Sequence, residues 1–182
     1  VDCGMRQGAD KKTELGEDKF PFNPAEIDAV LLTHAHIDHS GLIPLLVKQG
    51  FKGSIIATDA TAQLSGIMLP DSGHIQEQEA EYQTRKNLRA GKAPAEPLYT
   101  VQDAQNALKQ FTPTSYGRTV SVVSGITARF NDIGHLLGSS AIEIWVEENG
   151  KTTKLVFSGD IGREERPIIC DPQQVKGADY LV

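Results

Sequence analysis

The stretch AVLLTHAHIDHSG, residues 29–41, gives the strongest indication of both the fold and the function of this chain. Its first four residues are apolar, as in a strand that is buried on both faces. The segment GLIPLLVKQ at 41–49 then predicts a short helix, so the residues between the two lie in a tight turn. Four of these residues carry nitrogen or oxygen donors: His34, His36, Asp38 and His39. Because imidazole nitrogens and carboxylate oxygens are ligands that Zn²⁺ takes in proteins, the turn predicts a metal site.

The elements that follow this turn predict an α/β arrangement in the first half of the chain. Ser54–Thr58 is typical of a second buried strand, which completes a β-α-β unit. Ala60–Leu69 has a helical pattern. Residues 75–89 form a long charged stretch in which Glu81 and Arg85 can pair one helical turn apart on a solvated face.

The second half of the chain changes to the two-residue period of strands. Before this change, Thr100 is placed as the N-cap of a helix with Asp103 three residues on. The segments after it predict a β-meander with Gly or Asn-Gly turns. Its strands are 120–123, 126–130, 141–147 and 154–157. Residues 3–24 are rich in Gly, Pro and charged residues and predict a long loop.

Composition sets the outer limits on the kind of protein. The chain has 182 residues, a formal charge of −6 and two cysteines, which suits one globular domain without a disulfide framework. No apolar run approaches the roughly 20 residues that span a bilayer, so we expect a soluble, cytoplasmic protein without a membrane partner. The acidic balance requires that any nucleic acid be held by a local basic surface, by metal ions or by other parts of the protein.

Three more donor residues lie in short motifs elsewhere. His135 lies in NDIGHLLGSSA, Asp160 in LVFSGDIG after a predicted strand, and Asp2 in VDCG. Taken singly, a loop histidine or a Gly-flanked aspartate is usually a turn residue. Their order and spacing relative to HAHIDH change this interpretation.

Asp2, HAHIDH, GHLLGSS and FSGDIG occur in an order that resembles the metallo-β-lactamase superfamily along essentially the whole chain. GHLLGSSAIEI and FSGDIGR resemble the β-CASP branch of that superfamily, whose members are RNA- and DNA-processing nucleases. DCGMRQG, DSGHIQEQEAEY and EPLYTVQDAQNAL are similar to bacterial RNA-processing exonucleases of this fold.

The resemblance implies an α/β (α+β) fold, the αββα sandwich, with two zinc ions. One zinc would be held by His34, His36 and His135, and the other by Asp38 and His39. Asp160 would bridge both ions, and Asp2 would orient ligands from behind. The implied function is hydrolysis of RNA phosphodiesters by a metal-bound hydroxide, with Asp38 and Asp160 as catalytic residues and single-stranded RNA as the substrate.

The chain also departs from the family pattern. No histidine follows His135, although the family takes a further zinc ligand near the end of this domain. We therefore expect residues 1–182 to be a fragment of a metallo-β-lactamase domain, with the β-CASP cap domain and the C-terminal closing segment absent. The resemblance also allows a homodimer.

The sequence allows two other functions. A thioester or lactone hydrolase of the same superfamily is disfavoured because GHLLGSS replaces the T-P-G-H-T-x-G block of those enzymes. A non-catalytic RNA-processing subunit is disfavoured because the expected ligands are present. His74 is either a polar residue at the start of a helix or a substrate contact. Five basic side chains could contact RNA, but a solvated surface position is the simpler explanation for them. They are Lys11, Lys12, Arg85, Lys86 and Arg89.

Overall fold

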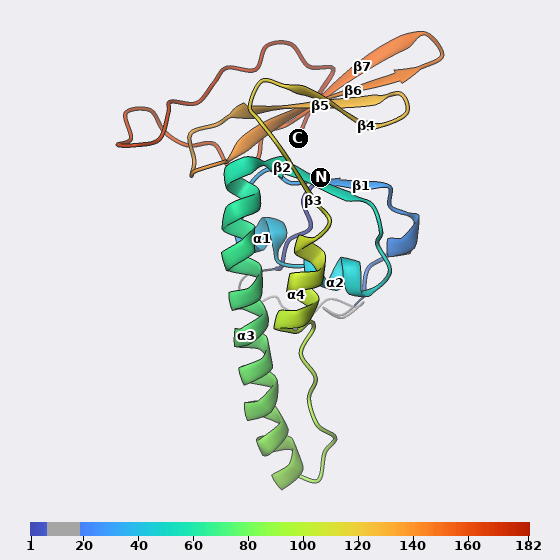
Figure 1. The fold of residues 1–182 in the computed structure, drawn as a ribbon, viewed down its shortest axis with the longest axis vertical. Coiled ribbons are helices and arrows are strands. Elements are labelled where there is room, and N and C mark those ends of the chain that lie inside the picture. The colour runs from blue at the N-terminus through green and yellow to red at the C-terminus, as the bar shows by residue number, and fades with distance from the viewer. Residues whose placement is uncertain (7–18) are drawn as a thin grey trace.

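A computed structural model of the chain describes residues 1–6 and 19–182. Lys11, Lys12 and most of the loop predicted over residues 3–24 lie outside these described residues. Two sheets face each other, and the helices gather on the far side of the first sheet (Figure 1).

The first sheet is parallel, in the order β1-β2-β3. It contains β1 (Ala29–Leu31), β2 (Ser54–Thr58) and β3 (Phe111–Thr114). The first two confirm the predicted β-α-β unit. β3 was not predicted, because its sequence FTPT is short and contains a proline, and strand propensity is low for such a segment. Its pairing with β2, from Ile55 opposite Phe111 to Thr58 opposite Thr114, supplies the order that the local sequence lacks.

The second sheet has the order β4-β5-β6-β7-β8. Its strands are β4 (Thr119–Val123), β5 (Ile126–Asp132), β6 (Ser140–Glu148), β7 (Lys151–Phe157) and β8 (Tyr180–Leu181). The first four run antiparallel, which confirms the predicted meander, and β8 adds a parallel edge.

Five helical segments accompany the sheets in the described part of the chain. They are the 3-10 turn η1 (Pro24–Glu26), α1 (Ile37–Ser40), α2 (Ile43–Lys48), α3 (Asp59–Arg89) and α4 (Val101–Leu108). The N-cap predicted for α4 is confirmed as a reciprocal capping box, in which the Asp103 N–H donates to Thr100 Oγ1 at 3.1 Å and the Thr100 N–H donates to the Asp103 carboxylate at 2.9 Å. The predicted helix 60–69 and the charged stretch 75–89 belong to one 31-residue helix, α3, that continues through Pro70.

The core consists of two apolar layers on either side of the first sheet. Leu31 and Ile56 meet Phe130 and Ile142 between the sheets, and other residues of β1 and β2 pack against α2 on the opposite side. This is the helix, sheet and sheet of the predicted αββα sandwich, so the mixed α/β fold class is confirmed. Among the described residues, no helix is long and apolar enough to cross a membrane.

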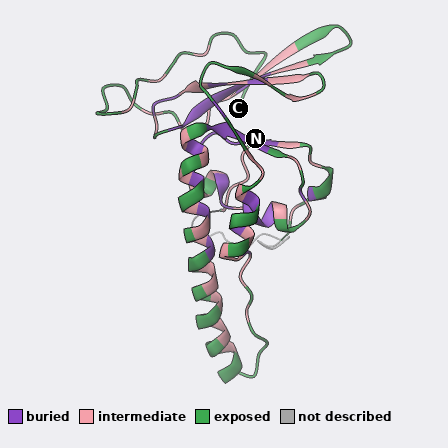
Figure 2. Cartoon of the chain, viewed as in Figure 1, coloured by how far each residue is buried: buried purple, intermediate pink, exposed green. Residues whose placement is uncertain are grey.

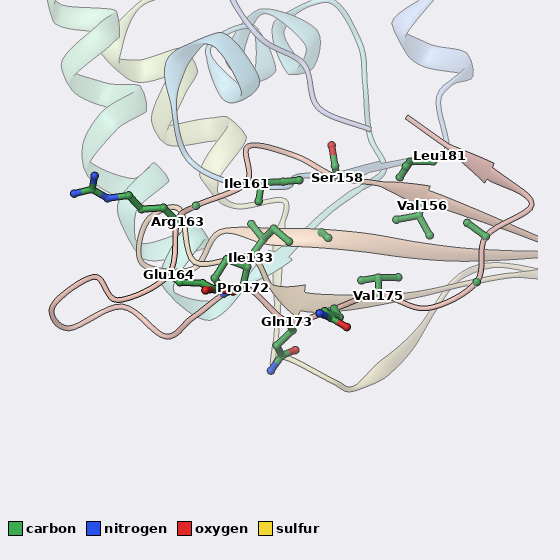
Figure 3. A pocket seen from close by; sticks show the side chains of 15 residues that line it. Ile133, Val156, Ser158, Ile161, Arg163, Glu164, Pro172, Gln173, Val175 and Leu181 are labelled. Atoms are coloured by element: carbon green, nitrogen blue, oxygen red, sulfur yellow. The ribbon is translucent and has the colours of Figure 1, made fainter.

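The outer face of the second sheet is covered by a loop, residues 158–179. Ala141 and Val156 point to this face, and a cavity of about 770 Å³ lies between them and the loop (Figure 3). Ile133, Pro172 and Val175 complete its apolar wall. The loop therefore stands where the fourth layer of the predicted sandwich would be.

A buried charge cluster lies on the same outer face. Glu143 is only 2% exposed, and its carboxylate accepts hydrogen bonds from Arg129 at 2.7 Å, Asn131 at 2.8 Å and Lys154 at 2.6 Å. Burial raises the pKa of this carboxyl, but the three donors outweigh it and hold the pKa below its ordinary value. The cluster ties β5, β6 and β7 together.

We expect Glu143→Gln to lower the free energy of unfolding by about 2 kcal/mol. Arg129 and Lys154 lose the negative charge between them, and one of the two acceptor oxygens becomes an NH2 donor. Since the folded-state pKa of Glu143 is depressed, its contribution is present above the ordinary carboxyl pKa of about 4.3 and is lost as pH falls through the folded-state value. Urea titrations at pH 7 and at a series of lower pH values measure both effects. Equal unfolding free energies for the two proteins at pH 7 would contradict this role.

Candidate metal centre

Three loops bring the predicted donors to one edge of the two sheets. The turn after β1 carries His34 and His36, the β5–β6 loop carries His135, and the segment after β7 carries Asp160. The Ser140 N–H donates to the Thr33 carbonyl at 2.9 Å, and the Gly162 N–H donates to the Ile133 carbonyl at 2.9 Å. These bonds fasten each loop to the next, so the donors converge.

The donor atoms are spaced as the ligands of one small cation. His34, His36, His135 and Asp160 each offer one atom, and these atoms lie within 4.8 Å of one another. His36 Nδ1 is 3.0 Å from His34 Nε2 and 3.3 Å from His135 Nε2. The ligand atoms of a tetrahedral site with bonds of about 2.0–2.1 Å are about 3.3–3.4 Å apart. The residues present therefore fit a divalent ion.

The two carboxylate oxygens of Asp160 face different histidines. Oδ2 lies 3.7 Å from His34 Nε2 and 3.5 Å from His135 Nε2, whereas Oδ1 lies 3.3 Å from His39 Nε2. A carboxylate in this position can serve two adjacent ions, one through each oxygen. The bridging role of Asp160 stays a prediction.

A hydrogen-bond chain from Asp2 determines which ring nitrogens are free. Asp2 Oδ2 lies 2.7 Å from His39 Nδ1 and 2.8 Å from Thr33 Oγ1. The Thr33 hydroxyl donates its single proton to Asp2, so it accepts from His34 Nδ1, 3.0 Å away. The Nε2 atoms of His34 and His39 then carry lone pairs, and both face Asp160. One carboxylate thus sets the tautomer of two histidines.

Burial keeps the central imidazole neutral. Burial, together with the neighbouring histidines His39 and His36, lowers the pKa of His34 to about 4, although Asp160 opposes the shift. The pKa of His135 is also lowered, chiefly by burial and again against the effect of Asp160. At neutral pH both rings are therefore unprotonated, which is the state that binds a metal.

The structure does not place all predicted site residues in this group. Asp38 is exposed in the first turn of α1 and is not one of the four converging donors. His74 is exposed on α3, where its ring contacts Gln78 at 2.9 Å. Their assigned roles stay predictions.

Two residues that support the site were not predicted from the sequence. Thr33 links Asp2 to His34. The presence of a hydroxyl residue directly before the first histidine could have indicated this role. Arg166 donates to the His135 carbonyl at 2.6 Å, and nothing in its local sequence marks it. The close approach of these loops also explains Gly162, since a Cβ atom there would overlap the Gly134 carbonyl.

The geometry agrees with a comparison to known families. The sequence model of the protein family described as the metallo-beta-lactamase superfamily matches residues 1–115, more than half of the chain. This chain belongs to the metallo-beta-lactamase superfamily. A solved metallo-beta-lactamase of Cronobacter sakazakii, described by a HARLDQ motif, aligns with 82% of this chain and 44% of its own, at 18% identity and a TM-score of 0.46.

Curated relatives of this superfamily member are longer proteins. Ribonuclease TTHA0252 of Thermus thermophilus is 35% identical over all of this chain and 36% of its own length. Transcription termination factor FttA of Methanococcus maripaludis is 31% identical over 93% of this chain and 25% of its own length. The chain thus spans about a third or less of these relatives. A ribonuclease and a transcription termination factor are the kinds of protein that the resemblance to the RNA-processing branch leads us to expect among the relatives.

We expect Asp2→Asn to weaken binding of a divalent ion by about 10- to 100-fold. Both carboxylate oxygens of Asp2 accept hydrogen bonds from Thr33 or His39, and asparagine replaces one of them with an NH2 group that only donates. Asparagine suits the test, since Asp2 has a φ of 55° and asparagine tolerates this left-handed conformation. Titration with Co²⁺, followed by absorbance, measures the affinity. Asp28→Asn, an exposed carboxylate elsewhere, is the matched control. Identical affinities for the two variants would show that Asp2 does not orient the ligands.

Proposed function

We propose that this domain forms the metal site of a ribonuclease that hydrolyses RNA phosphodiester bonds. The observation that carries the proposal is the position of Asp160, which faces His34 and His135 with Oδ2 and His39 with Oδ1. The names of the curated relatives, a ribonuclease and a transcription termination factor, support RNA as the substrate class. Because the chain spans only part of those relatives, the activity is proposed for the protein that contains this domain.

Zinc is the proposed metal, because nitrogen and carboxylate donors at this spacing suit it. His34, His36 and His135 would hold one ion, Asp38 and His39 the other, and Asp160 both. Two such ions supply a nucleophile from water at neutral pH and offset the charge that develops on the phosphate oxygens.

The chain's own residues prepare the site for this chemistry. Asp2 directs the Nε2 lone pairs of His34 and His39 toward Asp160. Arg166 holds the His135 carbonyl and so steadies the loop that carries this ligand. In this proposal Asp38, next to His39 in α1, would accept a hydrogen bond from the attacking water.

An open site suits a polymeric substrate. The Asp160 side chain is 43% exposed and that of His135 is 25% exposed, so a phosphodiester can approach from solvent. In this proposal the substrate is a single strand of RNA. A substrate contact by His74, a cytoplasmic location and a homodimer belong to this proposal as well.

We expect the purified chain to carry between one and two zinc ions, and His36→Ala or Asp160→Asn to lower this content. RNA cleavage by the protein containing this domain should fall by at least about 100-fold in either variant, since loss of a ligand costs more than loss of a residue that only orients one. Elemental analysis and cleavage of a labelled single-stranded RNA provide the two measurements.

Asp28→Asn again serves as the control, with metal content and cleavage expected to match the unaltered protein. Loss of metal in the variants without loss of RNA cleavage would separate the site from the activity and refute the proposed function. Cleavage of a thioester or lactone in place of RNA would assign the same site to another substrate class.

A further inference from the structure

Arg166 lies at the edge of the candidate metal centre without a carboxylate partner. One of its terminal nitrogens donates to the His135 carbonyl at 2.6 Å. Within the described residues 1–6 and 19–182, no carboxylate forms an ion pair with it, not even those of its neighbours Glu164 and Glu165. The side chain is exposed, and its only bond is to a neutral carbonyl, so its positive charge is not compensated within this part of the chain.

The loop that carries Arg166 is fastened to the end of β5 and to the connection after it. The backbone N–H groups of Gly162 and Gln173 each donate to a carbonyl there, at 2.9 and 2.8 Å. Between these two points, the Glu165 N–H donates to an Asp171 carboxylate oxygen at 2.8 Å. The backbone at Arg166 therefore has a fixed place, although the loop is exposed for much of its length (Figure 2).

The bond to His135 places the guanidinium beside the metal donors. The ring of His135 is one of the four converging donors, so its carbonyl and the cation bound there are separated from the cluster by one residue. Burial is the main cause of the lowered pKa of His135, and the charge of Arg166 contributes in the same direction. The cation is thus close enough for its field to reach the ring.

The remaining N–H groups of Arg166 suit an oxyanion. A guanidinium carries several N–H donors in a planar fork, and the bond to His135 uses only one of them. Such a fork matches two oxygens of a phosphate. We propose that Arg166 binds the RNA phosphate that lies at the metal site, by donating to its non-bridging oxygens. The identity of this ligand rests on the proposed function, because a guanidinium alone accepts other oxyanions as well.

Other cations near this part of the fold are less suited to the contact. Arg129 and Lys154 are already paired with the buried Glu143 carboxylate. Arg163 is exposed in the same loop as Arg166, and its side chain extends away from the neighbouring cavity (Figure 3). It makes no side-chain hydrogen bond or ion pair with the described residues, so nothing there fixes it relative to the donors.

Two substitutions separate the phosphate contact from the support that Arg166 gives to His135. Arg166→Gln removes the charge and keeps an N–H donor for the carbonyl, whereas Arg166→Lys keeps the charge and a donor but loses the fork. Arg163→Gln is the matched control, because it removes an equal charge from the same loop.

Three measurements are made on the protein that contains this domain. Co²⁺ affinity is followed by absorbance, the affinity of the Co²⁺-loaded protein for inorganic phosphate by calorimetry, and kcat/KM by cleavage of a labelled single-stranded RNA. We expect Arg166→Gln to bind Co²⁺ as the unaltered protein does, but to lose about 10- to 100-fold in phosphate affinity and in kcat/KM. Arg166→Lys should lose less than Arg166→Gln, and Arg163→Gln should match the unaltered protein.

The contact would be overturned by phosphate affinity that does not change in Arg166→Gln, or by an equal loss in Arg163→Gln. A fall in Co²⁺ affinity as large as the fall in phosphate affinity would also overturn it, because Arg166 would then act only through His135. Phosphate binding that depends on Arg166 in a protein unable to cleave RNA would support the anion contact and refute the ribonuclease function, so the two proposals fail separately.

Discussion

The carboxylate of Asp2 is the interaction on which the metal centre depends. It accepts the Thr33 N–H and hydroxyl and lies 2.7 Å from His39 Nδ1, so one side chain joins the chain start, the end of β1 and helix α1. Its effect reaches His34 through the Thr33 hydroxyl. Because a hydroxyl has one proton, donation to Asp2 forces acceptance from His34, and the free lone pair of that ring must face the other donors.

The architecture explains why these donors meet at one place. Parallel strands of the first sheet end at the edge where the β5–β6 loop and the end of β7 arrive from the second sheet. The backbone hydrogen bond from Gly162 to the Ile133 carbonyl brings the two loops so close that there is no room for a side chain at Gly162. Chemistry and packing therefore constrain the same residues, and the glycines next to His135 and Asp160 matter for close approach as much as for turns.

The predictable parts of the structure were those with a strong local signal. The apolar run before His34, the capping box at Thr100 and the alternation in β6 each report on neighbours within a few residues, and each was found as predicted. β3 and the continuous helix through Pro70 were missed because packing opposes local propensity there. Gly73 lies against the start of α4, where even a Cβ atom would meet the Val101 nitrogen at 2.9 Å, and this tertiary contact favours continuation of the helix.

The candidate site shows the same division. The donor types were evident in HAHIDH, but the choice among them depends on three-dimensional position. Asp38 and His39 are adjacent in sequence, yet only the His39 ring reaches an Asp160 oxygen at 3.3 Å, whereas Asp38 is exposed. A helix turns 100° between neighbouring residues, so α1 gives the two side chains different directions, and the ring of His39 is the one that meets Asp160. Which one points inward is set by the bond from Asp2 to His39, a contact 37 residues apart in the chain.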